Sequence, residues 1–208
     1  MSSVPLFIAL QPDLALTQFL LDAKERTRNQ VGDQLYLSDP PHLTLYLAYF
    51  ADITAVQHHI QALADTLQPV VGNLHGWHVF ENDVLTSRNT LTCQIDPAAI
   101  PQVRATQAAV IAALSPLRDV ARTRERYAAR LDQLSPERQQ AVETVGFPFI
   151  GDDWQPHFSV GSILPGDWPL VWADLQSTPP SGAFSCPQLK LYQLEGVTPR
   201  LVDTFPLG

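Results

Sequence analysis

The 208-residue sequence is poor in cysteine and in positive charge, and both shortages exclude classes of protein. Its two cysteines, Cys93 and Cys186, are too few for a disulfide framework and lack the C-x-x-C spacing of a redox or zinc site. We therefore expect buried free thiols in a reducing, cytoplasmic setting. Thirteen basic residues against 21 acidic ones give a formal net charge of −8. Such a chain is not expected to coat nucleic acid, which requires a basic surface, but a small anionic ligand or an RNA end is compatible with it.

Long apolar runs are also missing from the start of the chain. The apolar segment 4–10 is too short for a membrane span or a signal peptide and has no basic residues before it, so it predicts a first β-strand. We expect neither export nor membrane anchoring. With 45% hydrophobic residues, the chain can bury a core as one domain or as two half-size lobes. We expect residues 1–208 to form a single bilobal domain and a monomer.

The pattern of apolar residues, caps and turn residues alternates between helices and strands. Asp52 and Asp167 are expected to cap helices, and a long connection over about 119–151 is expected to hold one short helix and a loop near the site. Helices are predicted over 13–29, 52–67, 98–117, 136–145 and 167–175, and strands over 4–10, 42–50, 77–80, 90–95, 157–164, 184–194 and 200–207. The last two strands are expected to pair as a closing hairpin.

One short motif occurs twice, 115 residues apart, as Pro41-His42-Leu43-Thr44-Leu45 and as Pro156-His157-Phe158-Ser159-Val160. Two chance matches to His-apolar-Ser/Thr-apolar are expected in roughly one such chain in a hundred, so the duplication is a strong signal. On a strand, residues i and i+2 point to the same face about 7 Å apart, while their apolar neighbours face the core. If a pseudo-twofold axis relates the two halves, an imidazole and a hydroxyl then flank a cleft from each side.

With this pair of motifs the chain resembles the 2H phosphoesterase superfamily, the 2′-5′ RNA ligase-like and RNA cyclic phosphodiesterase proteins, which is named for two His-x-Thr/Ser-x motifs. The likeness extends over nearly the whole chain, in the segments 5–10, 134–137, 146–151, 189–194 and 205–207. It implies an α+β, bilobal, pseudo-twofold fold with two antiparallel β-sheets lining a central cleft and helices on the outside. Ser159 stands where threonine is commoner in the family, but either hydroxyl can donate to a phosphate oxygen.

The resemblance implies a hydrolase of RNA processing that acts on a 2′,3′-cyclic phosphate or a 2′,5′ linkage of a nucleotide or RNA end, with ligase activity in some relatives. Imidazole titrates near pH 6.5, so one histidine can be the base and the other the acid. His42 and His157 are the candidates, in an order that the sequence does not settle. Thr44 and Ser159 would hold the non-bridging phosphate oxygens. Neither a metal nor another cofactor is expected.

Other readings of the motif stay open at this point. A lone histidine beside apolar residues is more often structural, so the hypothesis depends on the duplication. A zinc site built from His42, His157 and Asp152 or Asp153 lacks a compact ligand spacing. A non-catalytic nucleotide or RNA-end binding module, or a 2H enzyme for a non-nucleic cyclic phosphoester, would use the same four residues.

Basic residues gather in one segment of this acidic chain. Six of the thirteen lie within 118–138, where they form either an electropositive arm or an ordinary solvated face: Arg118, Arg122, Arg124, Arg126, Arg130 and Arg138. Further side chains could contact a nucleotide or belong to the core, namely Arg124, Arg126, Trp154, Tyr46 and Phe80. The remaining histidines carry no motif and are expected to be structural or on the surface: His58, His59, His75 and His78.

Overall fold

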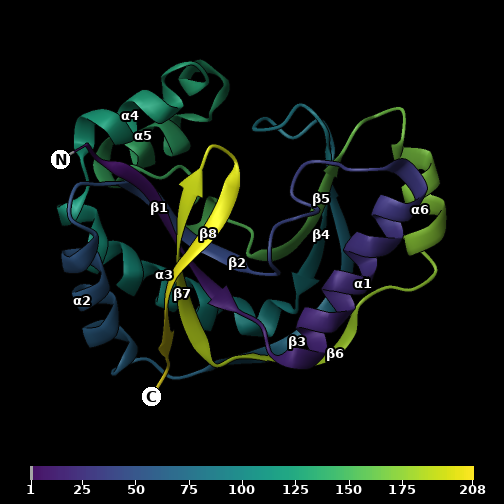
Figure 1. Ribbon diagram of the computed structural model, residues 1–208, viewed down its shortest axis with the longest axis horizontal. Helices are drawn as coiled ribbons and strands as arrows, with labels where there is room; N and C mark the ends of the chain where they lie inside the picture. Colours follow the sequence, from purple (N-terminus) through teal and green to yellow (C-terminus); the bar gives the residue numbers. More distant parts are fainter. Residues whose placement is uncertain (1) are drawn as a thin grey trace.

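The fold contains two four-stranded antiparallel sheets, as seen in a computed structural model that describes residues 2–208 (Figure 1). The first sheet has the order β2 (Leu43–Phe50), β1 (Val4–Gln11), β7 (Gln188–Glu195) and β8 (Thr198–Pro206). The second sheet has the order β5 (His157–Ile163), β4 (Asn89–Ile95), β3 (Val70–Phe80) and β6 (Ser181–Cys186). The predicted α+β class and the two antiparallel sheets are confirmed.

Within residues 2–208, six α-helices surround the sheets, namely α1 (Leu14–Val31), α2 (Ile53–Ala64), α3 (Ile100–Leu114), α4 (Val120–Ala128), α5 (Pro136–Val145) and α6 (Trp168–Leu175). Helices α1 and α6 pack together beside the second sheet, whereas α2, α4 and α5 lie beside the first (Figure 1). Helix α3 contacts both α2 and β2. No helix within residues 2–208 combines the length and the apolar composition that a membrane crossing needs.

Side-chain caps explain where several helices begin. Asp13 accepts a hydrogen bond from the Leu16 amide at 3.0 Å, and Asp52 accepts one from the Ala55 amide at 2.9 Å. Each satisfies an amide that has no partner within its helix. The predicted cap at Asp52 is therefore confirmed.

Three predictions about the elements are wrong. Asp167 precedes α6 but its side chain does not cap it; the carboxylate accepts from Gln34 at 2.9 Å instead. The connection 119–151 holds two helices, α4 and α5, where one was expected. The predicted strand 184–194 is two strands in different sheets, because Pro187 separates β6 from β7 and has no amide to donate to a ladder. Only β7 and β8 form the closing hairpin.

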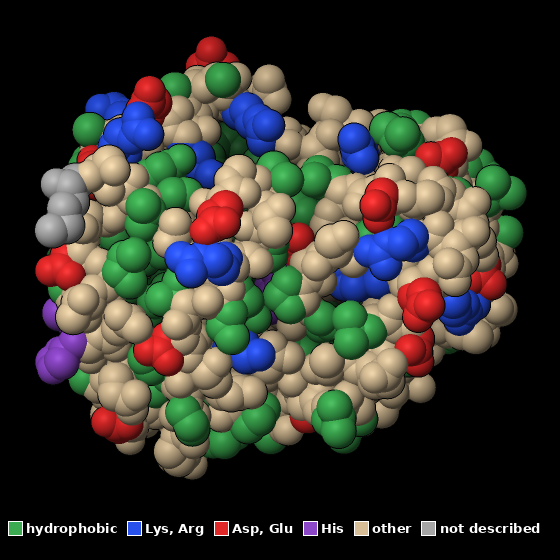
Figure 2. Space-filling model, viewed as in Figure 1, with side chains coloured by type: hydrophobic (Ala, Val, Ile, Leu, Met, Phe, Trp, Pro, Cys, Tyr) green, Lys and Arg blue, Asp and Glu red, His purple; other side chains and the backbone are tan. Residues whose placement is uncertain are grey.

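Strand order relates the two sheets by pseudo-twofold symmetry. The two motif strands, β2 and β5, hold the same place in their sheets, since each is the outermost strand, and they contact each other. Alternation along β1 puts Leu6, Ile8 and Leu10 in the main core, whereas Phe7 and Ala9 lie on the opposite face. The first sheet thus turns one face to the main core and the other away from it. The space-filling view shows the surface hollowed between the two lobes (Figure 2).

Candidate active site

The loop 32–41, which leads into the first motif, is bound to the strand that carries the second. The Ser162 amide of β5 donates to the Leu35 carbonyl at 2.8 Å. The Lys24 ammonium of α1, only 2% exposed, donates to the Tyr36 carbonyl at 2.6 Å and to the Val160 carbonyl of β5 at 2.7 Å. A buried ammonium needs such partners because burial without them is costly. Lys24 of α1 therefore links the loop that leads to His42 with the strand that carries His157.

A glycine in β5 allows this close approach. A Cβ atom placed on Gly161 would come within 2.7 Å of the Leu37 side chain, closer than real Cβ contacts come. Leu37 is 3% exposed, so it has little room to move away. Gly161 thus brings the loop 32–41 against β5, and with it the residue that follows the loop, His42.

The two motif histidines have the same local geometry. Nδ1 of His42 lies 2.7 Å from the Pro40 carbonyl oxygen, and Nδ1 of His157 lies 2.8 Å from the Gln155 carbonyl oxygen. A carbonyl only accepts, so Nδ1 carries the proton in both rings. In the neutral form Nε2 is then the free nitrogen of each ring, available to take a proton or, once protonated, to donate one.

The motif hydroxyls occupy matching positions. Thr44 and Ser159 are partly exposed, like His42 and His157, while the apolar residues between and after them are at most 1% exposed: Leu43, Leu45, Phe158 and Val160. This is the alternation that the strand pattern predicts. Among residues 2–208, neither hydroxyl has a hydrogen-bond partner, so both are available to a ligand.

Electrostatics around His42 disfavour its charged form. Burial lowers the pKa of His42 to about 4, against the opposing effect of the Pro40 carbonyl, and the positive charges of Lys24 and His157 lower it further. His42 is thus a neutral imidazole near neutral pH. The strands that carry the two rings, β2 and β5, contact each other.

His157 has a different set of neighbours. Burial lowers its pKa as well, but the Gln155 carbonyl and the Asp83 carboxylate raise it, and His78 lowers it slightly. Asp83 is fixed in the β3–β4 loop, where it accepts from Thr90 Oγ1 at 2.7 Å and from the Leu85 amide at 2.9 Å. A carboxylate therefore favours the protonated form of one histidine of the pair and not of the other.

Aromatic rings lie beside both histidines. The His42 ring centre is 5.1 Å from Phe7 and 6.1 Å from Tyr192, and these two rings stack on each other at 4.8 Å. Phe80 lies 5.1 Å from His157. The sequence pointed to Phe80 but not to Phe7 or Tyr192, because nothing in their local pattern distinguishes them from core residues.

Other sequence candidates have structural roles. Trp154 is 5% exposed, and Tyr46 is fully buried with its hydroxyl donating to the Val145 carbonyl at 2.5 Å. The two carboxylates considered for zinc form ion pairs elsewhere, Asp152 with Arg104 and Asp153 with Arg138. No group of three or more His, Cys, Asp or Glu side chains within residues 2–208 is placed to hold a metal ion. The two cysteines are buried free thiols, as predicted.

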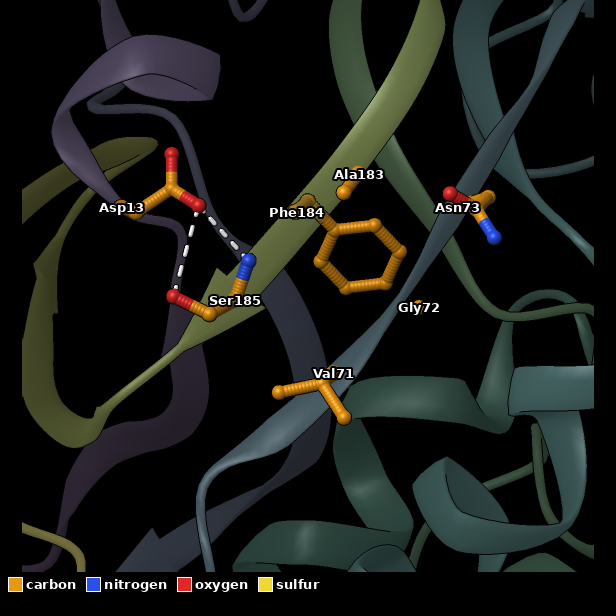
Figure 3. A pocket seen from close by; sticks show the side chains of 7 residues that line it. All are labelled: Asp13, Val71, Gly72, Asn73, Ala183, Phe184 and Ser185. Atoms are coloured by element: carbon orange, nitrogen blue, oxygen red, sulfur yellow. Dashed lines mark hydrogen bonds between the residues drawn. The ribbon is translucent and has the colours of Figure 1, made fainter.

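A surface hollow over β3 and β6 contains none of the motif residues (Figure 3). Its one carboxylate, Asp13, caps α1 and also accepts from the Ser185 amide at 2.6 Å, so both carboxylate oxygens already have a hydrogen-bond donor. The other residues that line it are Val71, Gly72, Asn73, Ala183, Phe184 and Ser185, none of which is charged. This hollow is therefore not a second active site.

Comparison with solved structures shows the same fold at low sequence identity. TT0787 of Thermus thermophilus matches with a TM-score of 0.58 and 15% identity, over 98% of this chain and 97% of that one. Escherichia coli LigT complexed with NADP+ matches with a TM-score of 0.52 and 11% identity, over 100% and 99%. LigT complexed with 3′-AMP matches with a TM-score of 0.50 and 14% identity, over 99% of both chains. No curated protein matches the chain significantly in sequence.

The fold and the two motifs define the chain as a 2H phosphoesterase. The family model of the 2′-5′ RNA ligase superfamily matches residues 12–198, and the chain belongs to that superfamily. Membership supports a phosphodiesterase-type activity.

Proposed function

We propose that this protein is a metal-independent phosphodiesterase that hydrolyses the 2′,3′-cyclic phosphate or 2′,5′-phosphodiester bond of a nucleotide or RNA end. The observation that carries the proposal is the matched pair of motifs. Each supplies a histidine oriented by the carbonyl two residues before it and a hydroxyl with no partner among residues 2–208. We further propose that both lobes act as one cytoplasmic, monomeric unit and need no cofactor.

Opening a cyclic phosphate requires a base on one side of phosphorus and an acid on the other. In the proposed mechanism, neutral His42 takes a proton from water through Nε2 as the water attacks phosphorus. The acid is assigned to His157, because burial lowers its pKa but the Asp83 carboxylate opposes that effect. In its protonated form it donates the Nε2 proton to the departing ribose oxygen. Thr44 and Ser159 donate hydrogen bonds to the non-bridging oxygens, where charge must be stabilised during phosphoryl transfer.

Turnover of defined substrates in EDTA tests the proposal. The panel contains 2′,3′-cyclic mononucleotides, RNA with a cyclic-phosphate end, and 2′,5′-linked dinucleotides. We expect turnover that falls by about 10²–10⁴ in His42→Ala and in His157→Ala, the usual contribution of an acid or base. His59→Ala, a change on the exposed face of α2, is the matched control and should keep full activity.

Turnover that needs added metal, or that survives both substitutions, contradicts the proposal. Tight nucleotide binding without turnover of any phosphodiester would favour a binding module. Turnover restricted to cyclic phosphoesters without a nucleobase would support the same roles for the two histidines but a non-nucleic class of substrate.

A further inference from the structure

Basic side chains of this acidic protein mostly bind the protein's own oxygen atoms. In the arginine-rich segment 118–138, three arginines form ion pairs, and a fourth donates to two backbone carbonyls: Arg122, Arg124, Arg138 and Arg118. Four of its six arginines are thus engaged within the protein, which fits an ordinary solvated face better than an electropositive arm.

One of the two lysines behaves differently. The chain contains only Lys24 and Lys190, and the proposed mechanism uses neither. The Lys24 ammonium is buried and bonded to two carbonyls. Lys190, in β7, is partly exposed, and its ammonium forms no ion pair within residues 2–208. Burial lowers its pKa, and no neighbouring charge of the described residues opposes this effect. The Lys190 ammonium is therefore available to an anionic ligand.

Lys190 lies on the face of the first sheet that carries His42. Alternation along β7 places Leu189 and Leu191 in the main core and Tyr192 on the opposite face. The Tyr192 ring centre is 6.1 Å from that of His42. Because Lys190 is two residues before Tyr192 on the same strand, it points to the same side of the sheet as the motif histidine.

A row of paired residues across three strands connects Lys190 with the motif hydroxyl. Ala9 of β1 pairs with Thr44 of β2 on one side and with Lys190 of β7 on the other. Directly paired residues of antiparallel strands project to the same face. Since neighbouring strands lie about 4.8 Å apart, Thr44 and Lys190 are about 10 Å apart at the backbone, and only the methyl group of Ala9 stands between them. One small anion can therefore contact both the hydroxyl and the ammonium.

The second sheet repeats this row with a different charge. Thr92 of β4 pairs with Ser159 of β5 on one side and with His78 of β3 on the other. His78 thus holds the place that Lys190 holds in the first sheet. Burial lowers the pKa of His78, so its ring is neutral near neutral pH. Of the two matched positions, only Lys190 carries a positive charge at that pH.

Resting on the proposed function, we propose that Lys190 is a further catalytic residue, whose ammonium binds a non-bridging oxygen of the reacting phosphate together with Thr44. Lysine is suited to this role because its ammonium is a compact point charge with three donors. A charge-assisted hydrogen bond to a phosphate oxygen is stronger than a neutral one. The phosphate then has Lys190 on one side and protonated His157 on the other. This arrangement stabilises the negative charge that develops during phosphoryl transfer.

Inorganic phosphate and a 2′,3′-cyclic mononucleotide are the two probes, the first for binding and the second for turnover. Lys190→Met removes the charge and keeps the length of the side chain. We expect calorimetry to show a loss of about tenfold in phosphate affinity, the usual effect of removing a hydrogen bond to a charged group. The value of kcat/KM for the cyclic nucleotide should fall by about a hundredfold, because the donor acts on charge that develops in the transition state.

Arg200→Met is the matched control, because it removes the same charge from the neighbouring strand β8, where Arg200 is paired with Glu195. This variant should keep the phosphate affinity and the kcat/KM of the wild type.

Restoring the ammonium separates the effect of charge from an effect of packing. Lys190→Cys, alkylated with 2-bromoethylamine, regains an ammonium on a side chain of the length of lysine and should recover most of the lost activity. The native thiols of Cys93 and Cys186 are 0% exposed and should stay unmodified.

Equal losses of phosphate affinity in Lys190→Met and Arg200→Met would mean a general effect of net charge and would overturn the inference. Wild-type kinetics of Lys190→Met, or a loss that the restored ammonium does not repair, would also overturn it. In each of these cases the proposed function stands as long as turnover is lost in His42→Ala. A wild-type protein that hydrolyses no phosphodiester overturns both.

Discussion

The two halves of the site share their backbone geometry but differ in their electrostatic surroundings. His42 and His157 each contact the carbonyl two residues earlier, on matching outermost strands. Around His42, however, lie stacked aromatic rings and the Lys24 charge, whereas His157 is within range of the Asp83 carboxylate. A duplicated motif can therefore fix the position of two identical groups, while residues outside the motif surround them with different charges.

After the histidines themselves, the largest effect is expected from the hydroxyls, where the halves should behave alike. Thr44→Val and Ser159→Ala should each lower kcat by about 10²–10³, the usual cost of removing one donor to a developing negative charge. Thr44→Ser and Ser159→Thr keep a hydroxyl and should keep most of the activity. Steady-state kinetics on a cyclic phosphate checks this, and a loss confined to one half would mean that the phosphate is held asymmetrically.

Lys24 connects the halves, so its removal should weaken both. Lys24→Met leaves the Tyr36 and Val160 carbonyls without their charged donor and should lower the free energy of unfolding by about 3 kcal/mol. Urea denaturation measures the loss. Lys190→Met is the matched control: Lys190, in β7, is partly exposed and should be tolerated with a much smaller change. An equal loss of unfolding free energy in both variants would contradict the role of Lys24 as the link between the two halves.

Acid should destabilise the protein through His42. The pKa of His42 is about 4 in the folded protein and near 6.5 when unfolded, so protons bind preferentially to the unfolded chain as the pH falls below 6.5. At pH 5 this should cost about 2 kcal/mol relative to pH 8. Urea denaturation across that range should show the loss in the wild type and a smaller loss in His42→Gln. His59→Gln should retain the full wild-type dependence.

The smallest effect should come from Asp83, which distinguishes the two histidines. Activity is expected to fall on the acidic side as His42 gains a proton and on the alkaline side as His157 loses one. Asp83→Asn removes a charge that raises the pKa of His157, so the alkaline limb of log(kcat/KM) should move to lower pH. The acidic limb should stay in place. A shift of the acidic limb alone would exchange the proposed roles of base and acid.

Local pattern was sufficient to predict most elements and the alternation that exposes the four motif residues on one face of their strands. Period-two alternation located β2 and β5, and Asp52 correctly marked the start of α2. The prediction failed where the neighbours are distant in sequence. The strands on either side of Pro187 are adjacent in sequence but pair in different sheets. The side chain of Asp167 binds Gln34, which is 133 residues away, and does not cap α6. Contacts of Lys24, Phe7 and Tyr192 with the site have the same long-range origin.

The order of strands in the first sheet has a consequence for folding. β1 lies between β2 and β7, and Leu10 pairs with Leu189, about 180 residues later in the chain. Closing such a large loop is slow, so the sheet stays incomplete until the rest of the chain has collapsed. During that interval β1 exposes an apolar edge that can pair with another molecule. We therefore expect efficient refolding only at low protein concentration.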